Sequence, residues 1–135
     1  MTATGPELTE PGEILRRNVP RAMFDGEKMS KTAFAPSDHD GMTSTLRGHV
    51  SVADAASRWE GNSPLIGTWP LPVRLATEMG LPCYDDGQQP CACGCEAMYP
   101  EDHASVDHRV LPSRSAQLRA ARKIRDAVEA AGPLT

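Results

Sequence analysis

The clearest hydrophobic pattern in the chain lies near its C-terminus, in residues 115–131. Apolar residues recur there every three or four positions, which is the spacing of one face of an α-helix. This apolar stripe comprises Ala120, Ala121, Ile124, Ala127, Val128 and Ala131. Ser113 or Ser115 can cap the first turn, and Gly132, followed by a proline, can end the helix. The pattern therefore predicts an amphipathic C-terminal helix.

The first third of the chain has short apolar runs that indicate strands. Residues 13–24 hold an apolar and basic run that Pro20 interrupts, and residues 25–26, Asp-Gly, form a turn signal. Residues 28–36 can form a second short strand that ends at a proline. In residues 42–52 apolar positions alternate with polar ones, so part of this segment is predicted to be a strand.

The middle of the chain predicts two short helices around one more strand. Ser51 is a good N-cap, with Asp54 in the capping-box position, so we expect a helix over residues 52–59. Residues 64–73 are apolar enough for a strand, but two prolines in them cannot donate to a sheet ladder, which favours an edge strand. Residues 74–79 suit one or two helical turns, closed by a glycine.

Together these elements predict an α+β fold. We expect a small, mostly antiparallel sheet with short helices and a C-terminal amphipathic helix packed across it. The length of 135 residues suits one domain. We assign residues 1–12, which are rich in Thr, Pro, Gly and Glu, to a flexible N-terminal segment. Residues 13–135 form the domain, with a cysteine-rich loop at 83–103.

The composition indicates a thin core. Leu, Ile, Val and Phe together number 22 residues, about 16% of the chain, below the usual level of a globular domain. The net charge of −4 is too small to favour disorder and argues against coating nucleic acid through bulk charge. Nucleic acid is therefore the less favoured partner. A thin core commonly gains stability from a metal, a disulfide or a partner.

The polar side of the predicted C-terminal helix has an unusual order of charges. Arginines crowd its first half and acids follow, which is the reverse of what the helix dipole favours. Intrinsic helix stability therefore does not explain this order. One interpretation is a solvated face without a role, and the other is a contact surface for a protein partner or an acidic ligand. That surface would comprise Arg119, Arg122, Lys123 and Arg125.

The most distinctive polar pattern is a cluster of cysteines, because three of the four lie within residues 91–95. Zinc takes about four nitrogen or sulfur ligands. The candidate ligands are Cys83, Cys91, Cys93, Cys95, His103 and His108. The Cys-x-Cys-x-Cys spacing differs from the usual Cys-x2-Cys zinc knuckle. A zinc site is therefore one interpretation, and free thiols without a role or a disulfide or redox pair are the alternatives.

A second constellation suits a nucleotide-like ligand. Arg16 and Arg17 stand in an apolar run, and hydroxyls follow at residues 43–45 of a later predicted strand. His39 or His49 can supply a general base. The same arginines also suit ordinary ion pairs, and the chain has no Walker loop, GxGxxG or HExxH motif. An enzyme or binder of such a ligand is therefore an alternative.

The order of several segments resembles a group of small bacterial proteins without an established activity. These segments are LRRNVPRAMFDGEKMSKTAFAP, DGMTSTL, VADAASRW, GTWPLPV, LP-x-YDDG and EDHASVD, followed by the basic C-terminal helix. The resemblance covers most of residues 14–131 and implies no catalytic residue. Against that group, residues 89–98 resemble an insertion, so a metal site there would be a local addition to the fold.

The N-terminus has no basic and apolar leader, and no apolar run is long enough for a membrane span. We therefore expect a cytoplasmic protein without a membrane partner. Our leading hypothesis is a small binding or accessory protein that acts through a partner contact, a role that would suit a mobile-element or conflict system. The alternatives are the nucleotide-like ligand and a zinc-stabilised structural module.

Overall fold

The computed structural model describes residues 5–135, so the first four residues of the expected flexible segment lie outside the described residues. The elements are β1 (Ile14–Pro20), the 3₁₀ helix η1 (Arg21–Met23), β2 (Phe24–Asp25), β3 (Lys28–Met29), the 3₁₀ helix η2 (Lys31–Phe34), β4 (Met42–Leu46), α1 (Val52–Ser57), β5 (Leu65–Pro72), α2 (Val73–Glu78), β6 (Cys83–Asp85), β7 (His103–Asp107) and α3 (Arg114–Ala131). The α+β fold predicted from the sequence is confirmed.

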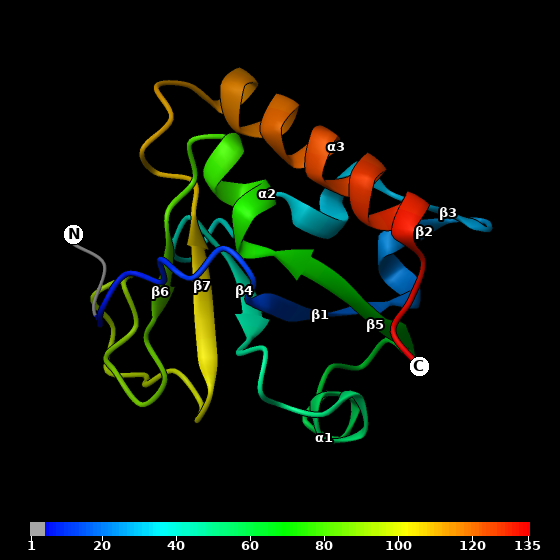
Figure 1. Cartoon of the computed structure of the whole chain (residues 1–135), viewed down its shortest axis with the longest axis horizontal. Helices are drawn as coiled ribbons and strands as arrows, with labels where there is room; N and C mark the ends of the chain where they lie inside the picture. Colours follow the sequence, from blue (N-terminus) through cyan, green and yellow to red (C-terminus); the bar gives the residue numbers. More distant parts are fainter. Residues whose placement is uncertain (1–4) are drawn as a thin grey trace.

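Five strands form one antiparallel sheet in the order β5-β1-β4-β7-β6. Strand β5 lies at one edge of this sheet. Its two prolines, which have no N–H to donate, are tolerated there because no further strand pairs with its outer side. In Figure 1, β1 and β5 run crosswise to β4, β6 and β7. A single residue pair, Arg16 with Leu46, joins β1 to β4, so these two strands part from each other beyond it. The sheet therefore has an opening between its two halves.

The core lies between this sheet and α3, which crosses one side of the molecule (Figure 1). Helix α3 begins after Ser113, whose hydroxyl accepts a hydrogen bond from the backbone N–H of Ala116 at 3.1 Å. The residues of α3 that enter the core are Ala120, Ala121, Ile124 and Val128. The other two alanines of the predicted stripe are exposed. The buried stripe is therefore narrower than the sequence pattern suggested.

Residues 28–36 are mostly not a strand, which corrects the sequence prediction. Only Lys28–Met29 pairs with β2, and η2 follows it. The hydroxyl of Ser30 accepts a hydrogen bond from the backbone N–H of Thr32 and so caps η2. Its consecutive residues Ala33 and Phe34 are both fully buried. A strand would turn these two side chains to opposite faces, whereas a helical turn brings both into the core.

The region 83–103, expected as one cysteine-rich loop, begins with β6 and runs into β7. All five residues of β7 are buried. Ala104 and Val106 belong to the core, while the three polar residues that alternate with them are buried as well. A short strand with a buried polar face has no clear hydrophobic pattern, so the sequence does not indicate β7.

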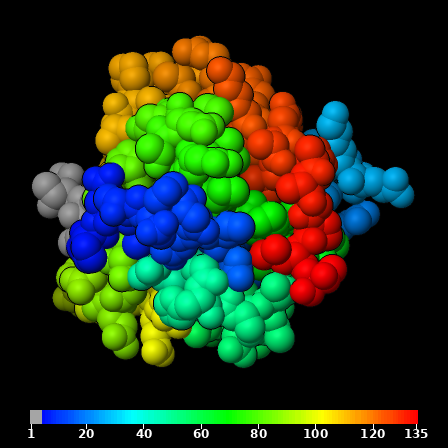
Figure 2. Space-filling model, viewed as in Figure 1, coloured from blue at the N-terminus to red at the C-terminus, as the bar shows by residue number. Residues whose placement is uncertain are grey.

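Residues 6–8 lie along β6. The backbone N–H of Leu8 donates to the carbonyl of Cys83 at 2.8 Å, and that of Asp85 donates to Pro6 at 2.9 Å. In Figure 2 the dark-blue N-terminal region covers the surface between the green α2 region and the teal α1 region. Among residues 5–135, none of the helices is both long and apolar enough to cross a membrane.

Candidate functional site

Four potential metal ligands converge next to β4. They are His39, from the turn before that strand, and Cys91, Cys93 and Cys95, from the loop before β7, with all ligand atoms within 4.8 Å of one another. Nε2 of His39 lies 3.4 Å from the sulfur of Cys91 and 3.8 Å from that of Cys95. The sulfurs of Cys93 and Cys95 are 2.6 Å apart. Two sulfurs on a tetrahedral zinc are about 3.8 Å apart, so this last pair would separate on binding. The cluster can hold a metal such as zinc.

Local backbone structure explains why these residues meet. The N–H of Cys91 donates to the carbonyl of Ala97 at 2.9 Å, and Gly94 has a positive φ of 84° that turns the chain between them. The hydroxyl of Tyr99 donates to Asp40 at 2.7 Å. This buried bond holds the loop against the turn that carries the histidine. The cluster is therefore fixed by contacts outside its own side chains.

The two outer thiols differ in acidity. The thiol of Cys93 donates to the sulfur of Cys95. This bond, helped by the backbone of Ala97, lowers the pKa of Cys95, and it raises the pKa of Cys93 to about 11. Metal binding needs thiolates, so Cys95 is the cysteine of this pair that is closer to its metal-binding form.

The other three predicted ligands lie elsewhere. Cys83 is buried in β6, and burial raises the pKa of its thiol to about 12. His103 is hydrogen-bonded through Nδ1 to Asp86 at 2.6 Å. His108 is fully buried and contacts Thr43. The structure thus brings together three of the six predicted ligands.

His39 is the ligand that sequence reasoning missed, since the sequence suggested it only as a general base. It stands 52 residues before Cys91 in the chain, and its neighbours Asp38 and Asp40 are typical of a polar turn. No local spacing connects it with the cysteines. The pairing of β4 with β7 and the Tyr99–Asp40 bond bring the two segments together.

The buried environment of His108 favours the neutral form of its ring at neutral pH. The hydroxyl of Thr43 donates to the carbonyl of Phe34 at 3.0 Å, so it accepts from Nε2 of His108 at 2.8 Å. Within the described part of the chain, Nδ1 of His108 has no hydrogen-bond partner. Burial lowers the pKa of His108 to about 4, against a weaker opposing effect of Asp107. Protonation would place an unpaired charge in the core.

Acidification should therefore destabilise the protein through His108. Above pH 6.5 the His108 side chain is neutral in the folded and in the unfolded chain. Between pH 6.5 and about pH 4 the unfolded chain binds a proton at this residue and the folded chain does not. We expect a loss of about 3 kcal/mol across this window, measured by urea unfolding at several pH values. His108→Gln should flatten the dependence. An unchanged slope in this variant would contradict the assignment.

The predicted contact surface on α3 is mostly accessible. Arg119, Arg122 and Lys123 are exposed, and no ion pair is found for them among residues 5–135. Arg125 is half-buried and pairs with Asp126 at 2.8 Å. The interpretation of this side of α3 as a surface for an acidic partner stays a prediction.

A cavity of about 400 Å³ lies between β1, β4 and the end of α1. Its lining includes Arg16 and Arg17, as the hypothesis of a nucleotide-like ligand required, together with two of the three predicted hydroxyl residues, Ser44 and Thr45. The histidine that lines it is His103. The two histidines proposed from the sequence, residues 39 and 49, do not line this cavity.

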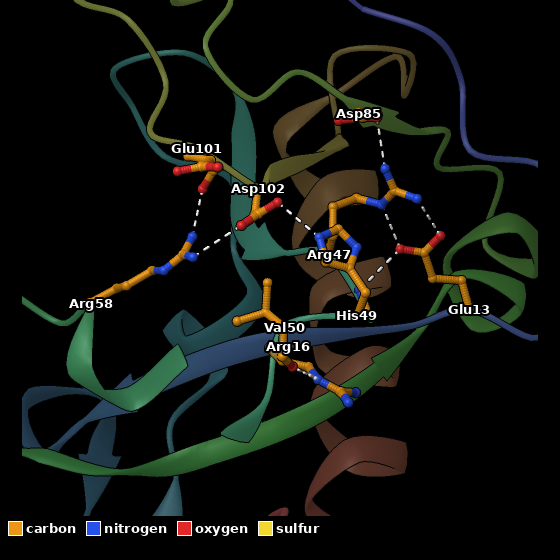
Figure 3. Close-up of polar contacts among 10 residues, drawn as sticks. Glu13, Arg16, Arg47, His49, Val50, Arg58, Asp85, Glu101 and Asp102 are labelled. Carbon is orange, nitrogen blue, oxygen red and sulfur yellow. Dashed lines mark hydrogen bonds and ion pairs between the residues drawn. The ribbon is translucent and has the colours of Figure 1, made fainter. Parts of the chain in front are cut away.

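A polar network fixes the rim of this cavity (Figure 3). Asp102 accepts from Arg58 at 3.0 Å and contacts His49 at 2.8 Å. The pKa of Asp102 is lowered by His49 and then by Arg58. Asp102 has a positive φ of 63°, an uncommon backbone conformation for a residue other than glycine, and it immediately precedes His103. The network therefore fixes the position of Arg58 and the start of β7.

No family model, curated protein or solved structure matches this chain.

Proposed function

We propose that the chain is a zinc-binding module whose metal centre fastens the loop before β7 to the turn before β4. The observation that carries this proposal is the convergence of His39, Cys91, Cys93 and Cys95 within 4.8 Å. These four donors come from two segments that are distant in the sequence.

The donor types favour zinc over other common cations. Thiolate and imidazole suit zinc, whereas calcium and magnesium prefer oxygen ligands. Three cysteines and one histidine complete a tetrahedral shell, so no position stays open for a reacting water. The proposed role is therefore structural. It also fits the small apolar content of the chain, because a bound metal adds stability that a thin core does not supply.

Elemental analysis and cobalt substitution test the proposal. The protein purified under reducing conditions should carry about one zinc per chain. Cobalt replacing it should give the strong visible bands of a tetrahedral site and a near-ultraviolet thiolate charge-transfer band. His39→Ala and Cys95→Ser should weaken binding by roughly 100-fold or more, because even residues that only support a ligand contribute 10–100-fold.

Matched variants at residues of the same type provide the controls. His49→Ala and Cys83→Ala each remove a candidate donor that lies outside the cluster, so metal content and cobalt spectrum should stay as in the unmodified protein. A chain that takes up no cobalt, or a thiolate band that is unaffected by Cys95→Ser, would contradict the proposal.

A further inference from the structure

The lining of the cavity between β1, β4 and α1 carries an excess of positive charge. It includes Arg16, Arg17 and Arg58 but a single carboxylate, Glu60. Arg58 is paired with Asp102. For the other two arginines, no ion pair with a carboxylate is found in the described part of the chain. A half-buried guanidinium without a counter-ion favours the binding of an anion.

Arg17 lies at the opening between β1 and β4. Its Nε donates to the carbonyl of Ala33 at 3.0 Å and its Nη1 donates to that of Ser44 at 2.9 Å. These neutral acceptors orient the guanidinium without cancelling its charge, and burial lowers its pKa to about 10. Arg17 and Ser44 also line a second cavity of about 370 Å³ beside η2. They therefore form a wall that two cavities share.

Arg16 is held in a similar way. Its Nε donates to the carbonyl of Val50 at 3.0 Å (Figure 3), and its Nη1 donates to that of Ile14 at 2.8 Å. Consecutive strand residues point to opposite faces of a sheet. Arg16 and Arg17 nevertheless line one cavity, because that cavity reaches the place where the two strands part. Two fixed arginines without a carboxylate partner among the described residues therefore line this cavity.

His103 adds an oriented polar group to the same cavity. Asp86, which is 2% exposed, accepts from Nδ1 of His103 at 2.6 Å and from the hydroxyl of Ser105 at 2.5 Å. The ring of Tyr99 stacks on the imidazole with centroids 4.2 Å apart. Nε2 of His103 has no hydrogen-bond partner among the described residues. The ring is thus locked, with one nitrogen left for a ligand.

The remaining wall is partly aromatic. Trp59 follows α1, and its indole N–H is already bonded to the carbonyl of Ser63 at 2.8 Å, so its ring offers apolar surface. A cavity of about 400 Å³ is within the usual size of small-molecule sites. Cations, an oriented imidazole nitrogen and an aromatic surface complement a phosphate, a hydroxyl and a base.

We infer that this cavity binds a small organic phosphate of the nucleotide class. Its phosphate lies at Arg16 and Arg17, a sugar hydroxyl contacts Nε2 of His103, and its base packs on Trp59. This site is separate from the four-residue metal cluster, so it does not depend on the zinc proposal.

Nuclear magnetic resonance of the full chain tests the inference. Four probes are added separately at millimolar concentration: adenosine monophosphate, ribose 5-phosphate, inorganic phosphate and adenosine. We expect saturable shifts at the side chains of Arg16, Trp59 and His103, with adenosine monophosphate the tightest probe. Adenosine, which lacks the phosphate, should bind at least about 10-fold more weakly, because a charged hydrogen bond typically contributes at least that factor.

Substitutions at single cavity residues test the proposed contacts with the phosphate and with the sugar one at a time. Arg16→Gln and Arg17→Gln should each weaken adenosine monophosphate binding about 10-fold, whereas Arg122→Gln on α3 should leave it unchanged. His103→Gln should weaken adenosine monophosphate but not inorganic phosphate. Melting curves verify that each variant is folded, and Arg16→Gln, at a partly exposed site, keeps the test valid if Arg17→Gln does not fold.

Three results would overturn the inference. The first is the absence of saturable shifts at the cavity with every probe. The second is equal affinity for adenosine monophosphate and inorganic phosphate, which would exclude the nucleotide class. The third is a response to adenosine monophosphate that maps to the basic side of α3 instead of the cavity.

Discussion

Removing zinc is expected to lower the free energy of unfolding by about 4 kcal/mol for a protein loaded at a thousand times its dissociation constant. For a chain of this length the melting temperature should fall by roughly 10–20 °C. The reason is that His39 and the three cysteines join two loops that few other side-chain bonds connect. Thermal unfolding followed by circular dichroism, with and without a chelator under reducing conditions, measures the change.

The variant Cys95→Ser supplies the control for this prediction. Cys95 is exposed, so replacing its sulfur by oxygen disturbs no packing. The variant should melt early without the chelator and show little further change when the chelator is added. Identical melting curves for the unmodified protein in both conditions would contradict a stabilising metal.

The second large effect is expected at Asp86. Asp86→Ala removes the acceptor of both His103 and Ser105 in a site that is almost closed to water. Each of the two buried donors left without a partner costs about 1–3 kcal/mol, so the free energy of unfolding should fall by roughly 2–6 kcal/mol. Urea unfolding at neutral pH measures this loss.

The neighbouring residue provides a matched comparison. Asp85 carries the same side chain but is 37% exposed, and it pairs with Arg47 at 2.7 Å (Figure 3). Exposed ion pairs contribute about 0.2–1 kcal/mol, so Asp85→Ala should have a small effect. A similar loss in the two variants would mean that Asp86 has no special structural role.

Elements with a local signal could be predicted from the sequence. Helix α3 has regularly spaced apolar residues, a serine N-cap and a glycine at its end. The prolines of β5 indicate an edge strand, and β5 lies at an edge of the sheet. Helix α1 begins after Ser51, whose hydroxyl accepts from Asp54 as the capping pattern indicated. Strand β7 and helix η2 could not be found in this way, because their stability comes from burial against distant segments.

The parts of the candidate site that lie close together in the sequence could also be predicted, whereas those joined by long-range contacts could not. Three cysteines within five residues identify a loop with possible metal chemistry. By contrast, His39 joins them through long-range contacts, the pairing of β4 with β7 and the Tyr99–Asp40 bond. His103, expected as a zinc ligand, is hydrogen-bonded to Asp86 instead. Arg16 and Arg17 look like a simple basic pair until the separation of β1 from β4 opens a cavity at them.

Tyr99 links the two proposed sites. Its hydroxyl holds Asp40 beside the metal cluster, and its ring stacks on the imidazole that lines the cavity. A metal that fixes the loop would therefore also limit the movement of the tyrosine ring that stacks on His103. By thermodynamic linkage, any factor by which zinc increases the affinity for the ligand is the factor by which the ligand increases the affinity for zinc. Because one tyrosine links the two sites, the affinity for the ligand measured with and without zinc would report the coupling between them.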